Sequence, residues 1–312
     1  MSEGLTASDV AQRVGLPIEQ VRRIWRTLGF PEHGEAAAYT EDDVAALGLI
    51  SGVMAEGIIG FDVTLNAARG LGLTMARLAD WEVSELVQHA EEAVAGANVE
   101  VGDADGVDAG TWLMERYGER FEEILIYAWR RHLSAAVARM DLLRAGDADP
   151  HTTNLSVGFA DIVGFTALSN EVSRERIGEL VETFETRCGD VIAREQGRLI
   201  KSMGDAVLFV NDDPMRAFAT AEGVINVIGR DPRMPDVRVG LATGGVVMRL
   251  GDVFGPPVNL AARLTQVARR NRIIVDHATA DLLPADEIES RPLPPRPVRG
   301  FGVVEPVAVR RQ

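Results

Sequence analysis

The sequence is poor in cysteine, in lysine and in long apolar runs, and each scarcity excludes a class of structure. Its one cysteine, Cys188, cannot form a disulfide within the chain, and a lone thiol suits a reducing compartment. No run of about 18 apolar residues occurs, so no membrane-spanning helix is expected. Met1 to Val10 is polar and acidic, unlike a signal peptide. We therefore expect a cytoplasmic protein without a membrane span.

Positive charge is also scarce. The chain has 32 basic and 47 acidic residues, which gives a formal net charge of −15. This balance argues against nucleic acid as the main partner, because phosphate contacts need a basic surface. With 312 residues, of which 46% are apolar and 25% charged, the chain is long enough for about two domains with a sizeable core.

Lys201 is the only lysine, and the other 31 basic residues are arginines. This bias suggests that position 201 needs a compact ammonium group, which suits a single ring nitrogen better than a planar guanidinium does. The alternative is a lysine retained by chance. Lys201 lies in a stretch, residues 197–210, in which two short apolar runs flank Ser-Met-Gly. That pattern predicts a tight β-hairpin with Lys201 and Asp205 near its tip.

The first half of the chain has helical periodicity, and we predict an all-helical domain over residues 1–145. Thr6 or Ser8 is the expected cap of the first helix, and Thr40 with Asp43 forms a short capping-box variant. Residues 96–110 read as a loop, residues 112–143 as a long amphipathic helix, and residues 146–153 as a linker.

The first helices resemble the winged DNA-binding unit of MerR-type regulators, although the same pattern makes ordinary helical bundles. Residues 1–60 contain four arginines and nine acidic residues, a net charge of −5, which argues against DNA binding there.

Strands and helices alternate in the second half. The predicted strands cover residues 155–159, 199–203, 206–210, 237–242, 246–250, 272–275 and 303–309, and the predicted helices cover residues 175–194, 214–228 and 258–268. The order β-α-β-β-α-β predicts an α+β fold with a ferredoxin-like domain over residues 154–312.

Two aspartates of this domain, Asp161 and Asp205, are candidate metal ligands. Asp161 ends the first strand, and Asp205 would lie beside it if the hairpin is the neighbouring element. Two carboxylates without nearby His or Cys suit Mg²⁺ or Mn²⁺. The turn after Asp161 would aim backbone N–H groups outward beside the carboxylate, which is the layout for a metal and a phosphate together, and Thr166 would cap the next segment. Phe165 and Thr166 are therefore candidate substrate-binding residues. The alternative is that both aspartates only form turns.

A third segment, residues 251–263, carries Asp252, Asn259 and Arg263. Pro256 and Pro257 precede a predicted helix, on which Asn259 and Arg263 share one face. Their place in the first turns of an otherwise apolar face favours phosphate or sugar contact, although such pairs often only face solvent.

Together the three motifs resemble the class III nucleotidyl cyclases. They read Phe-Ala-Asp-Ile-Val-Gly-Phe-Thr, Lys-Ser-Met-Gly-Asp and Asp-Val-Phe-Gly-Pro-Pro-Val-Asn-Leu-Ala-Ala-Arg. The resemblance assigns the roles of the individual residues. It implies that Asp161, Asp205 and the backbone carbonyl of Ile162 hold two Mg²⁺ or Mn²⁺ ions, that Lys201 and Asp252 select adenine, that Asn259 and Arg263 orient the ribose and stabilise the transition state, and that Arg299 contacts the terminal phosphate.

The resemblance implies an adenylate cyclase that converts ATP to 3′,5′-cyclic AMP and pyrophosphate at a homodimer interface. The helical half resembles a regulatory domain that precedes some actinobacterial cyclases, which are autoinhibited and respond to pH; His132 and His151 are its candidate sensors. A guanylate cyclase is disfavoured by Lys201 and Asp252, and a diguanylate cyclase or polymerase palm lacks the Asn259–Arg263 pair. The remaining alternative is a non-enzymatic transcriptional or signalling regulator with an inactive cyclase domain.

Overall fold

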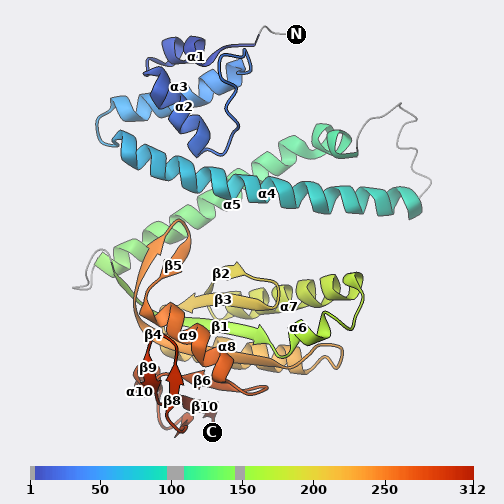
Figure 1. The fold of residues 1–312 in the computed structure, drawn as a ribbon, viewed down its shortest axis with the longest axis vertical. Coiled ribbons are helices and arrows are strands. Elements are labelled where there is room, and N and C mark those ends of the chain that lie inside the picture. The colour runs from blue at the N-terminus through green and yellow to red at the C-terminus, as the bar shows by residue number, and fades with distance from the viewer. Residues whose placement is uncertain (1–3, 97–108, 145–151) are drawn as a thin grey trace. The chain divides into compact units, whose positions relative to one another are not determined.

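The structure, a computed structural model, describes residues 4–96, 109–144 and 152–312 (Figure 1). The chain divides into two compact units, Met1–Ala135 and Ala136–Gln312. The predicted fold class, an all-helical region followed by an α+β domain, is confirmed. The predicted linker over residues 146–153 stays a prediction, because most of it lies outside the described residues. No helix within the described ranges has the length and apolar character needed to cross a membrane.

The first unit is built from helices. Their bounds are α1 (Ala7–Val14), α2 (Ile18–Thr27), α3 (Glu41–Ala55), α4 (Phe61–Gly96) and α5 (Ala109–Arg144). Thr6 and Thr40 cap α1 and α3 in capping boxes with Asp9 and Asp43, so these two predicted caps are confirmed. Buried side chains of α1 to α4 and Tyr39 form one core, and the predicted loop between α4 and α5 falls largely on residues that the structure does not describe.

The second unit is a sheet with helices on both faces. Its strands are β1 (Thr153–Ile162), β2 (Arg198–Ser202), β3 (Ala206–Asn211), β4 (Val237–Arg249), β5 (Asp252–Phe254), β6 (Ile273–Val275), β7 (Ile288–Pro292), β8 (Arg296–Val298), β9 (Gly302–Val304) and β10 (Val307–Arg311). Its helices are α6 (Phe165–Leu168), α7 (Arg174–Arg194), α8 (Pro214–Gly229), α9 (Pro256–Val267) and α10 (His277–Leu282).

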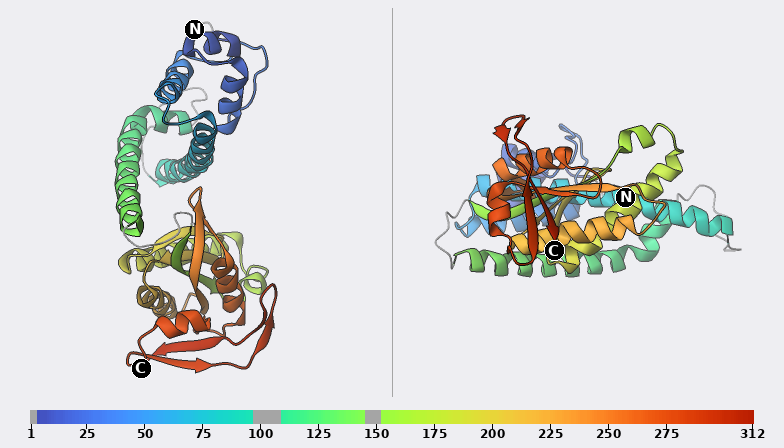
Figure 2. Two further views of the ribbon diagram at one scale, coloured as in Figure 1. Left: turned by 90° about the vertical axis from the view of Figure 1, so that its left-hand side faces the viewer. Right: turned by 90° about the horizontal axis from the view of Figure 1, so that it is seen from below.

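The strand order matches the predicted ferredoxin-like topology. The first four strands lie in the order β2-β3-β1-β4, with each neighbouring pair antiparallel. The sheet continues through β6, β10 and β7, and β5 folds back on β4 as a hairpin. β8 and β9 form a separate two-stranded ribbon. In the left view of Figure 2, α8 and α9 lie on opposite sides of the strands.

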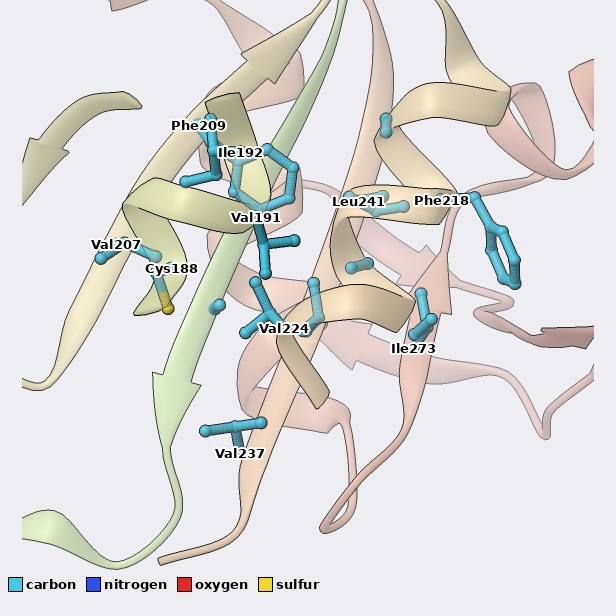
Figure 3. Close-up of a cluster of buried hydrophobic side chains, with 14 of the residues drawn as sticks. Cys188, Val191, Ile192, Val207, Phe209, Phe218, Val224, Val237, Leu241 and Ile273 are labelled. Atoms are coloured by element: carbon cyan, nitrogen blue, oxygen red, sulfur yellow. The ribbon is translucent and has the colours of Figure 1, made fainter. Parts of the chain in front are cut away.

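Alternation along the strands produces two apolar layers. Val207 and Phe209 of β3 face α7 and α8, whereas Leu208 and Val210 face the layer that includes α9. Figure 3 shows the first layer, in which Cys188 packs among aliphatic side chains. Burial raises the pKa of the Cys188 thiol to about 12, so this lone cysteine is a core residue and not a nucleophile.

Two strand predictions are wrong. Residues 237–242 and 246–250 are not separate strands, because β4 runs unbroken to Arg249. The glycines between them, Gly244 and Gly245, allow close approach: an added Cβ would lie 2.9 Å from Pro257 and 2.7 Å from Thr152. The expected last strand, residues 303–309, is two strands, β9 and β10, which pair with different partners on either side of Pro306.

Candidate active site

Asp161 lies at the end of β1, and Asp205 immediately precedes the adjacent strand β3, so the two are neighbours as predicted. β1 and β3 pair so that Asp161 is opposite Ala206, and the Ile162 N–H donates to the Asp205 carbonyl at 2.8 Å. Asp205 ends a turn in which Gly204 has a φ of 79°, a left-handed conformation that glycine adopts without strain. The turn therefore brings the second carboxylate to the end of β1 where the first one lies.

Arg238 of β4 is a site residue that the sequence interpretation missed. It is the direct cross-strand neighbour of Asp161, and its Nε and Nη2 lie 2.7 and 2.5 Å from the Asp161 Oδ2. Burial raises the pKa of Asp161, and the charge of Asp205 adds to this, although the hydrogen bond and charge of Arg238 oppose both. The only available sequence signal was a charged residue inside an otherwise apolar strand.

The donor set at this position fits a hard cation. It offers two carboxylates and the backbone carbonyl assigned to Ile162. The Arg238 guanidinium is not a metal ligand, and in this structure it is paired with Asp161. No group of three or more His, Cys, Asp or Glu suited to a metal ion occurs within the described parts of the chain. A Mg²⁺ or Mn²⁺ ion here would complete its coordination with substrate phosphates and water, which is the usual arrangement for Mg²⁺.

Lys201 and Asp252 form an ion pair. The Lys201 Nζ lies 2.6 Å from the Asp252 Oδ2, and the Val253 N–H donates to Oδ1 at 2.9 Å. Burial favours the neutral acid, but Lys201 and the Val253 N–H outweigh it and hold the pKa of Asp252 below its ordinary value. The β2–β3 register shifts between Leu199 and Lys201, and such a bulge re-aims the side chains next to it.

Asn259 and Arg263 lie on α9, which is seated closely on the sheet. An added Cβ at Gly240 of β4 would lie 2.3 Å from the Thr265 N and 2.4 Å from the Ala261 O, so glycine permits the contact. Asn259 is exposed, and the half-buried Arg263 donates to the Gln266 Oε1 at 3.3 Å. Among the described residues, neither side chain bonds to the other predicted site residues of the same chain.

The remaining predicted residues lie in two turns. Thr166 lies inside α6, whose N-cap is Gly164 without a side-chain bond, so the predicted capping role of Thr166 is wrong. The N–H groups of Phe165 and Thr166 have no acceptor within the described ranges. Arg299 is exposed in the turn between β8 and β9.

The sequence matches known cyclases. The family model described as the adenylate and guanylate cyclase catalytic domain matches residues 148–309. An adenylate cyclase of Streptomyces coelicolor is 36% identical, over 98% of this chain and 86% of the relative. An adenylate cyclase of Glutamicibacter nicotianae is 32% identical, over 96% and 76%.

A third relative is named for its regulation. A pH-sensitive adenylate cyclase of Mycobacterium tuberculosis is 29% identical, over 98% of this chain and 78% of the relative. These matches extend through the helical half as well as the sheet domain, and they confirm the predicted resemblance. The chain belongs to the family of adenylate and guanylate cyclases.

Proposed function

We propose that this chain is an adenylate cyclase that converts ATP to 3′,5′-cyclic AMP and pyrophosphate. The observation that carries the choice of ATP is the Lys201–Asp252 pair at 2.6 Å. Relatives with matches over nearly the whole chain bear the name adenylate cyclase, which supports the same reading.

Base selection follows from the chemistry of this pair. An ionised Asp252 accepts a hydrogen bond from the exocyclic amino group of adenine, and Lys201 donates to a ring nitrogen. Guanine presents a carbonyl and an N–H at the corresponding edge, so it would leave both protein groups facing the wrong partner. A mismatch of this kind discriminates strongly because buried polar groups remain unpaired.

The other residues position the triphosphate and stabilise charge. Two Mg²⁺ or Mn²⁺ ions, when bound, would activate the attacking 3′-oxygen and stabilise the leaving pyrophosphate. Asp161 and Asp205 would hold these ions with the Ile162 carbonyl. Asn259 and Arg263 would orient the ribose and neutralise charge as it develops. The N–H groups of Phe165 and Thr166, together with Arg299, would contact phosphate oxygens.

The proposed active enzyme is a homodimer with two composite sites. Lys201 and Asp205 lie on one hairpin, but Lys201 pairs with Asp252, whereas Asp205 lies beside Asp161. The hairpin therefore separates its cation from its anion. An isologous dimer would join the metal carboxylates of one chain to the base-selecting residues of its partner, twice.

The helical half is proposed to regulate turnover, with pH as the signal. His132, the candidate sensor that lies within the described residues, is exposed on α5. The second candidate sensor, His151, lies outside the described residues. The relative named as pH-sensitive supports this proposal.

Exchange of the base-selecting pair tests the substrate assignment. Lys201→Glu combined with Asp252→Cys should lower kcat/KM for ATP by about 10²-fold or more, because each lost base contact is worth about 1–3 kcal/mol. Cyclic AMP and cyclic GMP formation would be measured with Mn²⁺, with Arg270→Gln as a surface control. Unchanged ATP turnover in the double variant would show that neither residue contacts the base.

A further inference from the structure

A hollow of about 410 Å³ lies between α2 and α4 of the helical unit, and none of the residues assigned to catalysis lines it. Three arginines line it, Arg23 and Arg26 from α2 and Arg69 from α4, together with Leu73 and Ala76. Arginines are unexpected here, because residues 1–135 contain only ten of them against 23 acidic residues, a formal net charge of −13.

Close contact between the two helices brings the arginines together. Gly72 of α4 lies against the end of α2, where an added Cβ would be 2.2 Å from the Leu28 carbonyl oxygen. This backbone contact fixes the crossing point of the helices. Arg23 and Arg26, one helical turn apart, therefore line the same hollow as Arg69.

Two of these three arginines have no carboxylate partner among the described residues. Arg26 lies 3.1 Å from Glu32, and it is the only one of the three with a carboxylate partner among the residues that the structure describes. Arg23 stacks on the ring of Phe61, with its Cζ 5.6 Å from the centroid. Arg69 donates to the neutral Asn66 Oδ1 at 3.0 Å. Two positive charges are therefore left over.

Neighbouring arginines outside the hollow behave differently. Arg22, adjacent to Arg23 on α2, lies 2.7 Å from Glu35, and Arg13 of α1 lies 2.7 Å from Glu41. Pairing is not general in this unit, since Arg77 and Arg130 also have no carboxylate partner among the residues that the structure describes. Arg23 and Arg69 instead keep their charge beside a concave surface, which is the arrangement that an anionic ligand needs.

We propose that this hollow binds the phosphate group of a small molecule, as a phosphomonoester or a diphosphate. A phosphomonoester carries close to two negative charges at neutral pH, which matches the two uncompensated guanidinium groups. Guanidinium forks bind phosphate oxygens in a bidentate manner, and a carboxylate ligand would supply only one charge. The side chains of Leu73 and Ala76 would contact the uncharged part of the ligand. The proposal does not rest on cyclase activity.

Titration of the full-length chain with pyrophosphate tests the site. Calorimetry in EDTA, without ATP, leaves the proposed metal positions empty. Arg69→Gln should weaken binding about tenfold, the cost of one charge-assisted contact, and Arg69→Lys should weaken it less because the charge remains. Arg77→Gln removes the same charge two turns along α4 and should leave binding unchanged. Circular dichroism and unfolding midpoints would confirm that the variants fold.

A second arm separates a free phosphate compound from a lipid headgroup. Sedimentation with phosphatidylcholine vesicles, with and without phosphatidic acid, would be measured for the same variants. Binding in either arm that depends on Arg69 but not on Arg77 supports the site, and the responding arm identifies the source of the phosphate. Absence of binding in both arms, or equal binding by wild type and Arg69→Gln, would overturn the proposal.

Discussion

At the scale of single residues, the site holds its charges in pairs before any ligand arrives. Arg238 contacts the Oδ2 of Asp161, and Lys201 contacts the Oδ2 of Asp252. The two pairs are half-buried, with side-chain exposures of 27% and 18% for the first and 38% and 29% for the second. A ligand must therefore compete with, or join, an existing ion pair at each position.

Arg238→Gln tests this competition at the metal position. Without the guanidinium, the Asp161 Oδ2 is free and one repulsive charge is gone, so Mn²⁺ should bind about tenfold more tightly in the absence of nucleotide. Electron paramagnetic resonance of free Mn²⁺ measures this directly. Arg270→Gln, which removes an exposed arginine 3.7 Å from Asp236, is the matched control. Equal or weaker Mn²⁺ binding by Arg238→Gln would show that the pair does not oppose the metal.

The difference between Asp161 and Arg238 shows what a sequence reveals about a site. Asp161 and Asp205 each end or begin an apolar run at a glycine-containing turn, so their proximity follows once the strands are taken as neighbours. Arg238 becomes part of the site only through the β1–β4 register, which places it opposite Asp161 across 77 residues of chain. Local pattern contains no information about that register.

At the scale of elements, the seating of α9 on β4 determines where Asn259 and Arg263 lie. Residues 243–245, which include two glycines, separate two predicted strands. In the structure, the glycines of β4 lie inside the strand where other residues pack closely against it. The lack of a Cβ at Gly240 lets α9 contact the backbone, and its lack at Gly244 lets Pro257 do so. Whether a glycine marks a turn or a close contact depends on packing partners that are distant in sequence.

Gly240→Ala should both destabilise the fold and lower turnover. Its Cβ would overlap backbone atoms of Thr265 and Ala261, which cannot rotate away, so the free energy of unfolding should fall by about 2–4 kcal/mol. Gly189→Ala in α7, where a Cβ meets nothing within 4 Å, should be neutral or raise stability by up to about 1 kcal/mol. Urea unfolding compares the two. An unchanged midpoint for Gly240→Ala would contradict the seating of α9.

At the scale of the whole molecule, the helical half is proposed to make turnover depend on pH. Replacement of His132 and His151 by Gln should flatten the pH–activity profile of the full-length enzyme between about pH 5 and 8, where histidine titrates. The comparison needs cyclic AMP formation by wild type and variant at several pH values, with unfolding midpoints measured in parallel. Superimposable profiles would exclude these histidines as the sensor.

The contacts between distant segments show which features of the site the sequence pattern does not predict. The hairpin and the pairing of β1 with β3 could be predicted from residues 197–210 and the strand order. The direct contact between Lys201 and Asp252 does not follow from that pattern, because Asp252 is 51 residues away and reaches Lys201 through the β4–β5 hairpin; only the resemblance to the cyclases assigned both residues to adenine. The sequence thus predicts the members of the site better than their contacts.

Mixing two inactive variants tests the central claim most directly, since it requires cyclase chemistry, metal carboxylates and composite sites together. Asp205→Ala and Asn259→Ala should each be inactive alone. In the proposed dimer, Asn259 acts with the base-selecting residues of its own chain, opposite the metal carboxylates of the partner. After subunit exchange, half of the dimers are mixed, and each mixed dimer then has one intact site and one with both defects. Cyclic AMP formation from ATP with Mn²⁺ should therefore recover to about a quarter of the wild-type rate. No recovery, with exchange confirmed by differently tagged subunits, would contradict the shared site.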